Sequence, residues 1–290
     1  MFRKVGIIAR KYGDEIEDTL TTLIALLRRL EIAVAVDAAS AEFITDAAVE
    51  ILDLDSLAAD RDLVIAVGGD GTLLYAAQRL FRHDVPLAGV NLGRVGFLAD
   101  VSPERLEPDL VAILNGRYKT DERVFLDCEA YRDGSLRLRT SALNDVVIQK
   151  WNTARLITFD TYIDQRLVHT QRSDGLIIAT PTGSTAYALA GGGPILHPSV
   201  PALVVVPICP HTMTNRPIVV DDSVVIEVAL ATGRKAEAQL TCDGNEVFLL
   251  EPGDRVRVRR SDHRVRLIHP EQHDHYATLR AKLHWGMDLC

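Results

Sequence analysis

The sequence predicts two domains, an α/β domain with a parallel sheet followed by a domain of two packed β-sheets. Up to about residue 120, short apolar runs alternate with segments of helical periodicity. This βαβ order produces a parallel sheet with helices on both sides. Beyond residue 121, short β-rich runs dominate the sequence. The length of 290 residues suits two domains of ordinary size.

The predicted elements of the first domain begin with a buried strand at residues 5–9. Six apolar residues then recur at helical spacing and predict an amphipathic helix: Ile16, Leu20, Leu23, Ile24, Leu27 and Leu30. Ser102 and Pro103 predict a later helix, with serine as the cap and proline at the first position. The remaining elements are strands at residues 32–36, 63–67 and 86–90 and a helix at residues 72–82.

The second domain is predicted from a series of β-rich runs and two turn signals. Asp133-Gly134 and Asp243-Gly244 are dipeptides typical of two-residue hairpin turns. The last predicted element is a helix at residues 276–283, in a segment that we expect to pack back on the first domain. The β-rich runs lie at residues 124–131, 136–143, 146–148, 156–163, 176–179, 203–206 and 224–230, and at Val256 with Val258.

Composition restricts the class of protein. Hydrophobic residues make up 47% and charged residues 25% of the chain, as in an ordinary globular protein. The net charge of -8 argues against a general nucleic-acid binder, and no run is long and apolar enough for a membrane helix. The four cysteines, which form no C-x-x-C pair, are expected to be free thiols: Cys128, Cys209, Cys242 and Cys290. The first residues resemble a strand rather than a signal peptide, so we expect a cytoplasmic protein.

A glycine-rich loop at residues 68–72, here called the glycine loop, is the first candidate site. Gly68, Gly69 and Gly71 allow the backbone to turn tightly and approach a ligand. The following helix directs free N–H groups toward the loop, which suits a phosphate. Asp70 could accept a proton from an attacking hydroxyl, or it could hold a Mg²⁺ ion that bridges phosphates. The alternative is an ordinary turn, in which Asp and Gly are common.

A second candidate is the hydroxyl loop, residues 180–185, which follows an apolar strand. Its four hydroxyl groups could donate to phosphate or ribose oxygens: Thr180, Thr182, Ser184 and Thr185. Tyr187 offers a flat face for a base or a nicotinamide ring. A short helix follows and is ended by three glycines. The alternative is a simple helix cap, which is a commoner use of such residues.

The ordered set of motifs resembles that of NAD kinases over most of the chain. The glycine loop alone is shared with lipid kinases and phosphofructokinases, whereas the motif at residues 181–187 is specific to NAD kinases. The resemblance rests on residues 68–72, 93–98, Asn144-Asp145, Asp174-Gly175, 181–187 and 283–285.

This resemblance implies a fold and an activity. It implies a Rossmann-like α/β domain at residues 1–121, a β-sandwich domain that binds the dinucleotide at residues 122–270, and a C-terminal segment at 271–290. The active site would lie in the cleft between the domains. ATP and a divalent cation such as Mg²⁺ would support phosphorylation of the 2′-hydroxyl of the adenosine ribose of NAD. Members of the family form homodimers or homotetramers.

The resemblance also assigns roles to residues. Asp70 would be the catalytic carboxylate, and Gly68, Gly69, Gly71 and Thr72 would cradle phosphates. Phe97 would pack on the adenine. The rest of the dinucleotide site would be formed by Asn144, Asp145, Asp174, Thr182, Thr185, Ala186 and Tyr187. The resemblance identifies no protein ligand to the metal.

At two positions this chain departs from the family pattern, and at a third it matches one subgroup of the family. Asp145 stands where Glu is usual, and Asn245 stands where Gln is common in the dinucleotide site. Arg172 resembles the proteobacterial subgroup, which prefers oxidised NAD to NADH and uses ATP. His197, His211, His273 and His275 have no zinc-site spacing and are interpreted as ordinary histidines.

Two other functions remain open on the sequence. A lipid kinase would share the glycine loop, but it should lack the hydroxyl loop and should carry an apolar entrance or a basic membrane face. A non-catalytic dinucleotide sensor would bind NAD or NADPH without needing Asp70. The arginines at residues 255–266 alternate along predicted strands, and we interpret them as a solvated sheet face.

Overall fold

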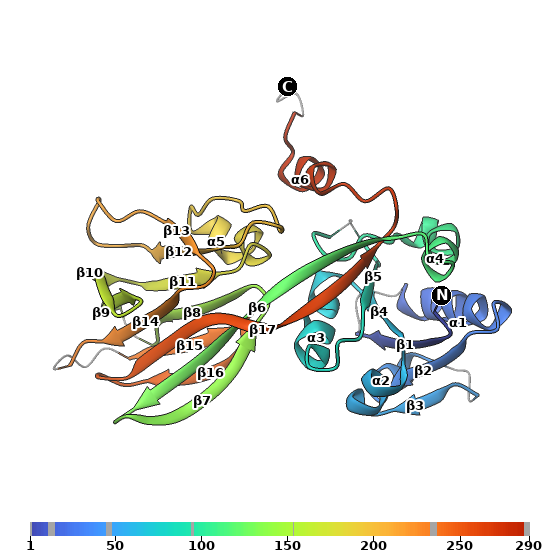
Figure 1. The fold of residues 1–290 in the computed structure, drawn as a ribbon, viewed down its shortest axis with the longest axis horizontal. Helices are drawn as coiled ribbons and strands as arrows, with labels where there is room; N and C mark the ends of the chain where they lie inside the picture. The colour runs from blue at the N-terminus through green and yellow to red at the C-terminus, as the bar shows by residue number, and fades with distance from the viewer. Residues whose placement is uncertain are drawn as a thin grey trace. The chain divides into compact units, whose positions relative to one another are not determined.

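The computed structural model of the chain describes residues 2–10, 15–44, 48–93, 96–152, 154–232 and 237–286, without the side chains of residues 246 and 247. It contains two compact units, and each is described by itself (Figure 1). Unit 1 comprises Met1–Glu122 and Arg264–Cys290. Unit 2 comprises Arg123–His263.

Unit 1 is an α/β layer structure. Its sheet has the strand order β5-β4-β1-β2-β3, and every pair in this series is parallel, as predicted. Its elements are β1 Lys4–Ala9, α1 Ile16–Arg29, β2 Ala33–Asp37, η1 Ser40–Phe43, β3 Glu50–Leu52, α2 Leu54–Asp60, β4 Leu63–Gly68, α3 Asp70–Leu80, β5 Leu87–Asn91, η2 Pro103–Arg105, α4 Leu106–Leu114 and α6 His275–Leu283.

Alternating side chains of the unit 1 sheet pack on helices at both faces. Ile7, Ile65 and Val67 belong to one buried cluster with residues of α1 and α4. On the other face α2 and α3 contact each other and the sheet. Gly89 on β5 lies so close to Ala99 that a Cβ atom would approach the Ala99 backbone to 2.7 Å. Residues 96–101, called the amide loop below, therefore lie directly against β5.

Unit 2 is built of two antiparallel sheets. Its elements are β6 Lys119–Arg132, β7 Ser135–Ala142, β8 Asp145–Lys150, β9 Ile157–Ile163, β10 Arg166–Ser173, β11 Gly175–Ala179, η3 Gly183–Thr185, α5 Tyr187–Ala190, β12 Ala202–Ile208, β13 Ile218–Asp221, β14 Val225–Leu230, β15 Ala238–Cys242, β16 Asn245–Leu250 and β17 Arg255–His269. The bounds of β6 and β17 include residues of both units.

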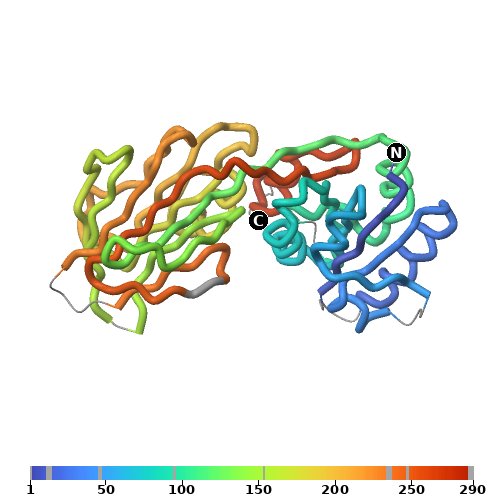
Figure 2. The backbone as a smooth tube through the Cα atoms, turned by 60° about the horizontal axis from the view of Figure 1, so that its bottom comes forward, coloured from blue at the N-terminus to red at the C-terminus, as the bar shows by residue number. Residues whose placement is uncertain are grey.

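The core of unit 2 lies between these sheets, which confirms the predicted sandwich. One sheet has the order β13-β12-β11-β8-β15-β16, and β10-β9-β14-β17 with β6 and β7 supply the other (Figures 1 and 2). Phe159 of β9, Ile148 of β8 and Val256 of β17 lie in the same cluster and are fully buried. The outer face of the six-stranded sheet carries a smaller cluster with Ala188 of α5. Because successive side chains of a strand point to opposite faces, β8 and β11 contribute residues to both clusters.

Several elements differ from their predicted form. The helix expected at residues 72–82 begins at Asp70, so the aspartate is its first residue. Ser102 makes no side-chain cap hydrogen bond, and Pro103 opens a 3-10 turn before α4. The strand β10 was not predicted, because its hairpin turns at Asp164 and Gln165, which is not a usual turn pair. Both residues have positive φ, 47° and 65°, as a type I′ turn requires.

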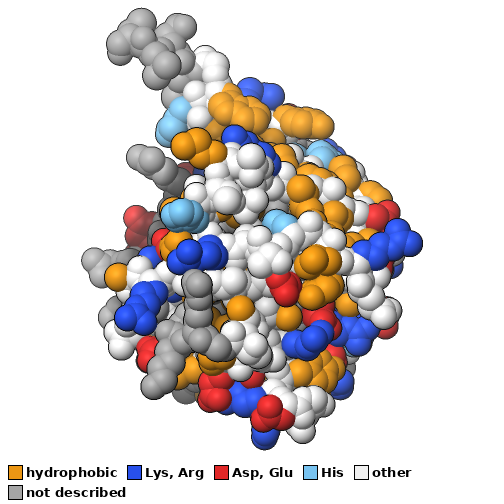
Figure 3. Space-filling model, turned by 90° about the vertical axis from the view of Figure 1, so that its left-hand side faces the viewer, with side chains coloured by type: hydrophobic (Ala, Val, Ile, Leu, Met, Phe, Trp, Pro, Cys, Tyr) orange, Lys and Arg blue, Asp and Glu red, His pale blue; other side chains and the backbone are white. Residues whose placement is uncertain are grey.

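The surface arginines of β17 are paired with carboxylates. Arg255, Arg259, Arg260, Arg264 and Arg266 form ion pairs with Glu227, Asp127, Asp222, Glu122 and Asp84, respectively. On the face shown in Figure 3, basic and acidic side chains are interspersed with hydrophobic ones. Cys128 and Cys242 are buried free thiols and Cys209 is exposed, while Cys290 lies outside the described residues. Within the described residues, no helix has the length and apolarity that a membrane crossing demands.

Truncating the fully buried Phe159 should destabilise unit 2. Phe159→Ala removes an aromatic side chain from the sandwich core, and we expect a loss of about 3–5 kcal/mol in the free energy of unfolding. Urea denaturation followed by circular dichroism would measure it. The control is Leu167→Ala on β10, where the side chain is 57% exposed and the change should stay within about 0.5 kcal/mol. Equal losses in both variants would contradict the assignment of the core.

Candidate active site

The glycine loop joins the buried strand β4 directly to α3. Gly68 has φ +152°, and a Cβ atom there would overlap the hydroxyl of Thr72, so the position requires glycine. The N–H groups of Thr72 and Leu73 donate to the carbonyl of Gly69 and begin the helix. Gly71 is exposed and Thr72 is buried beneath it. The loop therefore presents a short exposed stretch of backbone at the N-terminus of an 11-residue helix.

Asp70 holds the amide loop. Its carboxylate accepts hydrogen bonds from the backbone N–H groups of Phe97, Leu98 and Ala99 at 2.8, 2.9 and 3.0 Å. Gly96 must be glycine, because a Cβ atom there would overlap the Asp70 carboxylate. A carboxylate has about four lone-pair sites, and these three donors occupy three of them. Counting the described residues, Oδ1 accepts two bonds and Oδ2 accepts one, which leaves a further acceptor site on Oδ2.

Two cationic side chains lie near these loops and were not predicted. The Arg10 guanidinium stacks on Tyr75 of α3, 3.5 Å from the ring centroid. The Arg10 carbonyl is 3.5 Å from the Cβ position at Gly68, so the residue borders the glycine loop. Lys282 of α6 places its amine 5.9 Å from the centroid of the Phe97 ring. Arg10 directly follows the first strand, and this position at a carboxyl end of the sheet is the signal that could have identified it.

In unit 2 the hydroxyl loop packs against Asn144. Thr180 donates its hydroxyl to the Leu143 carbonyl at 2.5 Å, and its N–H donates to the Asn144 carbonyl at 2.9 Å. A Cβ atom at Gly183 would overlap the Asn144 carbonyl. Ser184 donates to the Pro181 carbonyl at 2.6 Å. Thr180 and Ser184 are fully buried, so their hydroxyls build the loop and do not face a ligand.

Asp243 organises the neighbouring backbone and opposes the charge of Asp145. Its carboxylate accepts from the N–H groups of Leu143, Asn144 and Asp145 at 2.7, 2.7 and 2.9 Å. Asp243 and Gly244 have positive φ and form the predicted hairpin turn between β15 and β16. Burial, together with the nearby Asp243 charge, raises the pKa of Asp145 to about 7. Asp145 therefore changes its protonation near neutral pH.

A groove of about 500 Å³ opens on the outer face of the six-stranded sheet beside these residues. Of the predicted residues it brings together Asn144, Asp145, Ala186 and Tyr187. Residues at alternate positions of β8 and β15 complete it, since they point to the same face. The lining residues that sequence reasoning missed are Val147, Gln149, Trp151, Gln239, Thr241, Asp243 and Gly244. The polar residues at every second position of two apolar strands are the signal that could have found Gln149, Gln239 and Thr241.

The other predicted residues of unit 2 lie outside the lining of this groove. Thr182 is buried, and its hydroxyl accepts from Arg123 at 3.2 Å. Thr185 donates to the Thr182 carbonyl at 3.1 Å, which is a cap-like contact. Asp174 pairs with Lys150 at 2.7 Å. Arg172 on β10 and Asn245 after the hairpin turn are exposed. Each of these contacts lies within unit 2.

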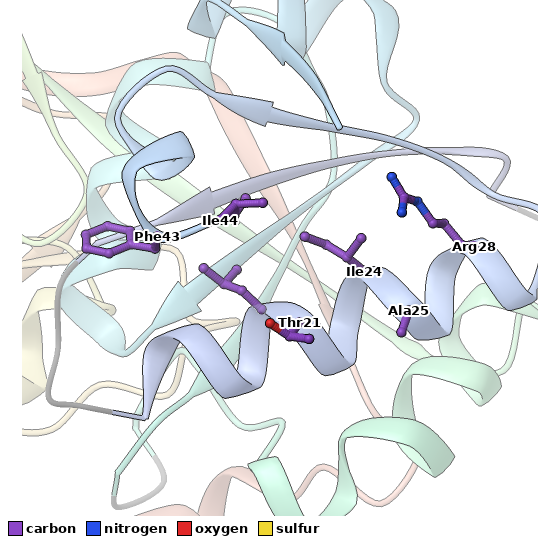
Figure 4. A pocket seen from close by; sticks show the side chains of 7 residues that line it. Thr21, Ile24, Ala25, Arg28, Phe43 and Ile44 are labelled. Carbon is purple, nitrogen blue, oxygen red and sulfur yellow. The ribbon is translucent and has the colours of Figure 1, made fainter. Parts of the chain in front are cut away.

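Two other cavities hold none of the predicted site residues. A hollow of about 140 Å³ in unit 1 is lined by Ile24, Ala25 and neighbouring residues of α1 and by Phe43 and Ile44 (Figure 4). Among the described residues, the lining of this hollow is mostly apolar and contains no carboxylate and no residue of the hydroxyl loop. A hollow of about 570 Å³ in unit 2 is lined by outward-facing residues of β9, β14 and β17, including the Arg255–Glu227 ion pair. Neither combines a glycine loop with titratable groups, so we place the site elsewhere.

Comparison with models of known protein families identifies the family of this chain. Residues 5–118 match the family model described as the ATP-NAD kinase N-terminal domain, and residues 143–270 match the ATP-NAD kinase C-terminal domain. The chain belongs to the NAD kinase family. A NAD kinase of Nitrosococcus oceani is 43% identical over 288 residues, 99% of this chain and 98% of that protein. A NAD kinase of Aromatoleum aromaticum is 44% identical over 286 residues, 98% of this chain and 95% of that protein.

Solved structures confirm the fold of an NAD kinase. A yeast NADH kinase complexed with NADH has a TM-score of 0.89 at 24% identity, covering 99% of this chain and 89% of that one. At that identity the likeness shows the fold alone. An NAD kinase from Archaeoglobus fulgidus in complex with ATP has a TM-score of 0.74 at 26% identity, covering 97% of this chain and 98% of that one. The family resemblance predicted from the motifs is thus confirmed, and the chain is an enzyme of the NAD kinase type.

The raised pKa of Asp145 predicts a pH dependence of stability. The folded state holds this proton more tightly than the unfolded chain, whose ordinary value is 3.8. The contribution of Asp145 to stability is therefore fully present below about pH 4 and is lost as pH rises through about 7. Asp145→Asn cannot lose this proton, so its free energy of unfolding should not fall in the same way. Relative to the wild type, the free energy of unfolding of the variant should rise by roughly 1–3 kcal/mol from pH 5 to pH 8.

Urea midpoints at both pH values would measure this difference. Asp262→Asn, which changes an exposed carboxyl of the same unit, is the matched control and should follow the wild type at each pH. If the difference between Asp145→Asn and the wild type is the same at pH 5 and pH 8, Asp145 does not titrate in this range.

Proposed function

We propose that the chain transfers the γ-phosphoryl group of ATP to the 2′-hydroxyl of the adenosine ribose of NAD, producing NADP and ADP. The observation that carries the proposal is the position of Asp70 as first residue of α3, directly after the exposed backbone of the glycine loop, in a chain that matches both NAD kinase domain models. In-line phosphoryl transfer needs positioned phosphates and an acceptor for the hydroxyl proton. In unit 1, the backbone of the glycine loop would position the phosphates, and Asp70 of the same loop would accept the proton.

Unit 1 would bind phosphates and activate the hydroxyl. The exposed backbone at Gly71 and the N-terminus of α3 favour negative charge, and Arg10 adds a permanent cation beside the loop. Asp70 would accept the proton of the attacking hydroxyl through the free acceptor site on Oδ2. Its three amide donors fix the carboxylate in place, which limits the reorganisation that the reaction requires. Phe97 would pack on the adenine.

Unit 2 would bind the dinucleotide along its groove. The exposed rings of Trp151 and Tyr187, which are 43% and 42% exposed, offer faces for the base or the nicotinamide. Asn144 and Asp145 would contact ribose hydroxyls. Because Asp145 is half-protonated near pH 7, it could accept from or donate to such a hydroxyl. Asp174, Thr182, Thr185, Ala186 and Asn245 are proposed contacts that the family resemblance supports.

A divalent cation such as Mg²⁺ would neutralise the phosphates of ATP during transfer. The residues present fit an ion that arrives with the nucleotide, since Mg²⁺ is usually held by one or two carboxylates together with substrate phosphates. Among the described residues, the group of three ligand side chains that gathers within 4.8 Å contains two histidines, which Mg²⁺ does not favour. Asp70 is a carboxylate within the glycine loop itself.

Three further aspects of the proposal come from the resemblance. The enzyme would act in the cytoplasm as a homodimer or homotetramer. Arg172, exposed on β10, would favour oxidised NAD over NADH. ATP would be the phosphoryl donor in preference to polyphosphate.

The direct experiment is an assay of NADP formation. Purified protein is incubated with Mg²⁺, with NAD⁺ or NADH as acceptor, and with ATP or polyphosphate as donor. We expect NADP from NAD⁺ and ATP, and a lower kcat/KM with NADH that Arg172→Ala raises. Product with polyphosphate would remove the proposed donor preference and leave the activity standing. Phosphorylation of lipid vesicles would instead favour a lipid kinase, and saturable NAD binding without product would favour a dinucleotide sensor.

Substituting Asp70 tests its role as proton acceptor. Asp70→Asn should lower kcat by roughly 10²- to 10⁴-fold, with the Kd for NAD close to the wild-type value. Because Asp70 also accepts the backbone N–H groups of the amide loop, the substitution weakens these hydrogen bonds too. A control variant has to measure the effect of weakening such bonds. Asp62→Asn provides this control, since the Asp62 carboxylate accepts the backbone N–H groups of Arg3 and Lys4 at 2.7 and 3.1 Å.

The Asp62 variant should lose thermal stability and keep kcat. If Asp70→Asn retains turnover within tenfold of the wild type, the carboxylate is an anchor and not the base. The same conclusion would follow if both variants lose turnover in proportion to their loss of stability.

A further inference from the structure

A cluster of two histidines and one aspartate lies in unit 1, where β17 ends. Asp100 Oδ2 is 3.1 Å from His269 Nδ1 and 2.7 Å from His273 Nδ1. The two imidazole rings stack, with centroids 4.1 Å apart and planes inclined by 20°. One oxygen and two nitrogens thus converge on one point, all within 4.8 Å of one another. This convergence is a property of the fold, since Asp100 is 169 residues before His269.

The cluster is built into the protein and leaves polar atoms without partners. The His269 side chain is 1% exposed, Asp100 is 10% exposed and His273 is 14% exposed. Asp100 Oδ1 and His269 Nε2 are buried and have no hydrogen-bond partner among the residues that the structure describes. Two imidazoles that meet the same carboxylate oxygen must both carry a proton on Nδ1 if no cation is present, which restricts the tautomer of each.

We propose that Asp100, His269 and His273 form a binding site for a transition-metal ion of the Zn²⁺ class, separate from the divalent ion of the phosphoryl transfer. Two imidazole nitrogens and one carboxylate oxygen are the usual donors to Zn²⁺ at a site with an open fourth position. Bonds of about 2.0 Å at tetrahedral angles separate ligand atoms by roughly 3.3 Å. The observed 3.1 and 2.7 Å differ from this by little, so small shifts of the side chains would admit the ion.

The surroundings of the cluster fit such an ion. Asp121 Oδ2 lies 4.0 Å from His269 Nε2, on the far side of the ring from the proposed ion. Metal-bound histidines commonly direct their second nitrogen to a carboxylate, which orients the ring. The Gln272 side-chain amide donates to the Asp109 carboxylate at 2.9 Å, and the Lys119 amine donates to the His273 carbonyl at 2.7 Å. These two hydrogen bonds hold the turn between His269 and His273. Lys119 also places a positive charge nearby, which weakens cation binding.

The site would connect the end of β17 to the amide loop. Asp100 directly follows Ala99, whose N–H group donates to Asp70 at 3.0 Å. An ion bound to Asp100 and His273 would fasten the segment that leads into α6 onto the loop that holds Asp70. Binding should therefore raise the thermal stability of unit 1, because an ion that binds only the folded state stabilises it.

The test uses the full-length, untagged protein after dialysis against a chelator, with Zn²⁺ itself as the probe. Isothermal titration should give one saturable site, and Co²⁺ bound in its place should show the visible absorption of a tetrahedral complex. His273→Asn should weaken Zn²⁺ binding by at least about tenfold, as loss of a ligand requires. The midpoint of thermal unfolding should rise with Zn²⁺ in the wild type and not in this variant.

The matched control is His83→Asn. His83 pairs with a single carboxylate, Asp55, at 3.1 Å, so it tests the loss of an ordinary His–Asp contact in the same unit. It should bind Zn²⁺ as the wild type does. Asp100→Asn, which keeps the shape of the carboxylate and removes its charge, gives a second test should His273→Asn fold poorly, and it should also bind more weakly. Absence of a saturable Zn²⁺ site, or equal loss in the His83 and His273 variants, would overturn the proposal.

Discussion

In each unit, a carboxylate that accepts three consecutive backbone N–H groups organises the loop that carries candidate site residues. Asp70 does so for residues 97–99 in unit 1, and Asp243 does so for residues 143–145 in unit 2. Three N–H groups that point to one side of a loop would be costly to leave unpaired, and a single anion satisfies them all. The conformations of the amide loop and of the Asn144 segment therefore depend on one side chain each.

These anchors have different consequences for the groups around them. Asp145 is buried close to the Asp243 carboxylate, and both effects raise the pKa of Asp145 to about 7, so this carboxyl is half-protonated near neutral pH. Among the described residues, the Asp70 carboxylate accepts from the three backbone N–H groups of the amide loop. The proposed reaction needs a fixed proton acceptor, and the same three bonds that hold the loop would fix Asp70 for that role.

The sequence predicted most of the fold and the positions of the loops because both depend on local signals. The apolar run of β4, the helical spacing of α1 and the dipeptide Asp243-Gly244 each act over a few residues. What it could not predict depends on contacts between distant residues. The sequence left open whether the hydroxyls of Thr180 and Ser184 face a ligand or serve as a cap, and in the structure they donate to the carbonyls of Leu143 and Pro181. The hairpin into β10 turns at Asp164-Gln165, a pair without a usual turn signal.

The histidines show the same limit most sharply. His269 and His273 have the H-x3-H spacing that zinc sites use, but the sequence does not show their partner Asp100, which lies 173 residues before His273. The parallel sheet brings them together, because Asp100 follows β5 and His269 ends β17, and these two strands pair at Leu87 and Leu267. The amide loop consequently has two attachments, Asp70 at residues 97–99 and the histidine cluster at Asp100. Any ligand that changes the second attachment acts one peptide bond from the first. A cation at the proposed site would therefore act on the loop whose amides hold the Asp70 carboxylate, the proposed proton acceptor.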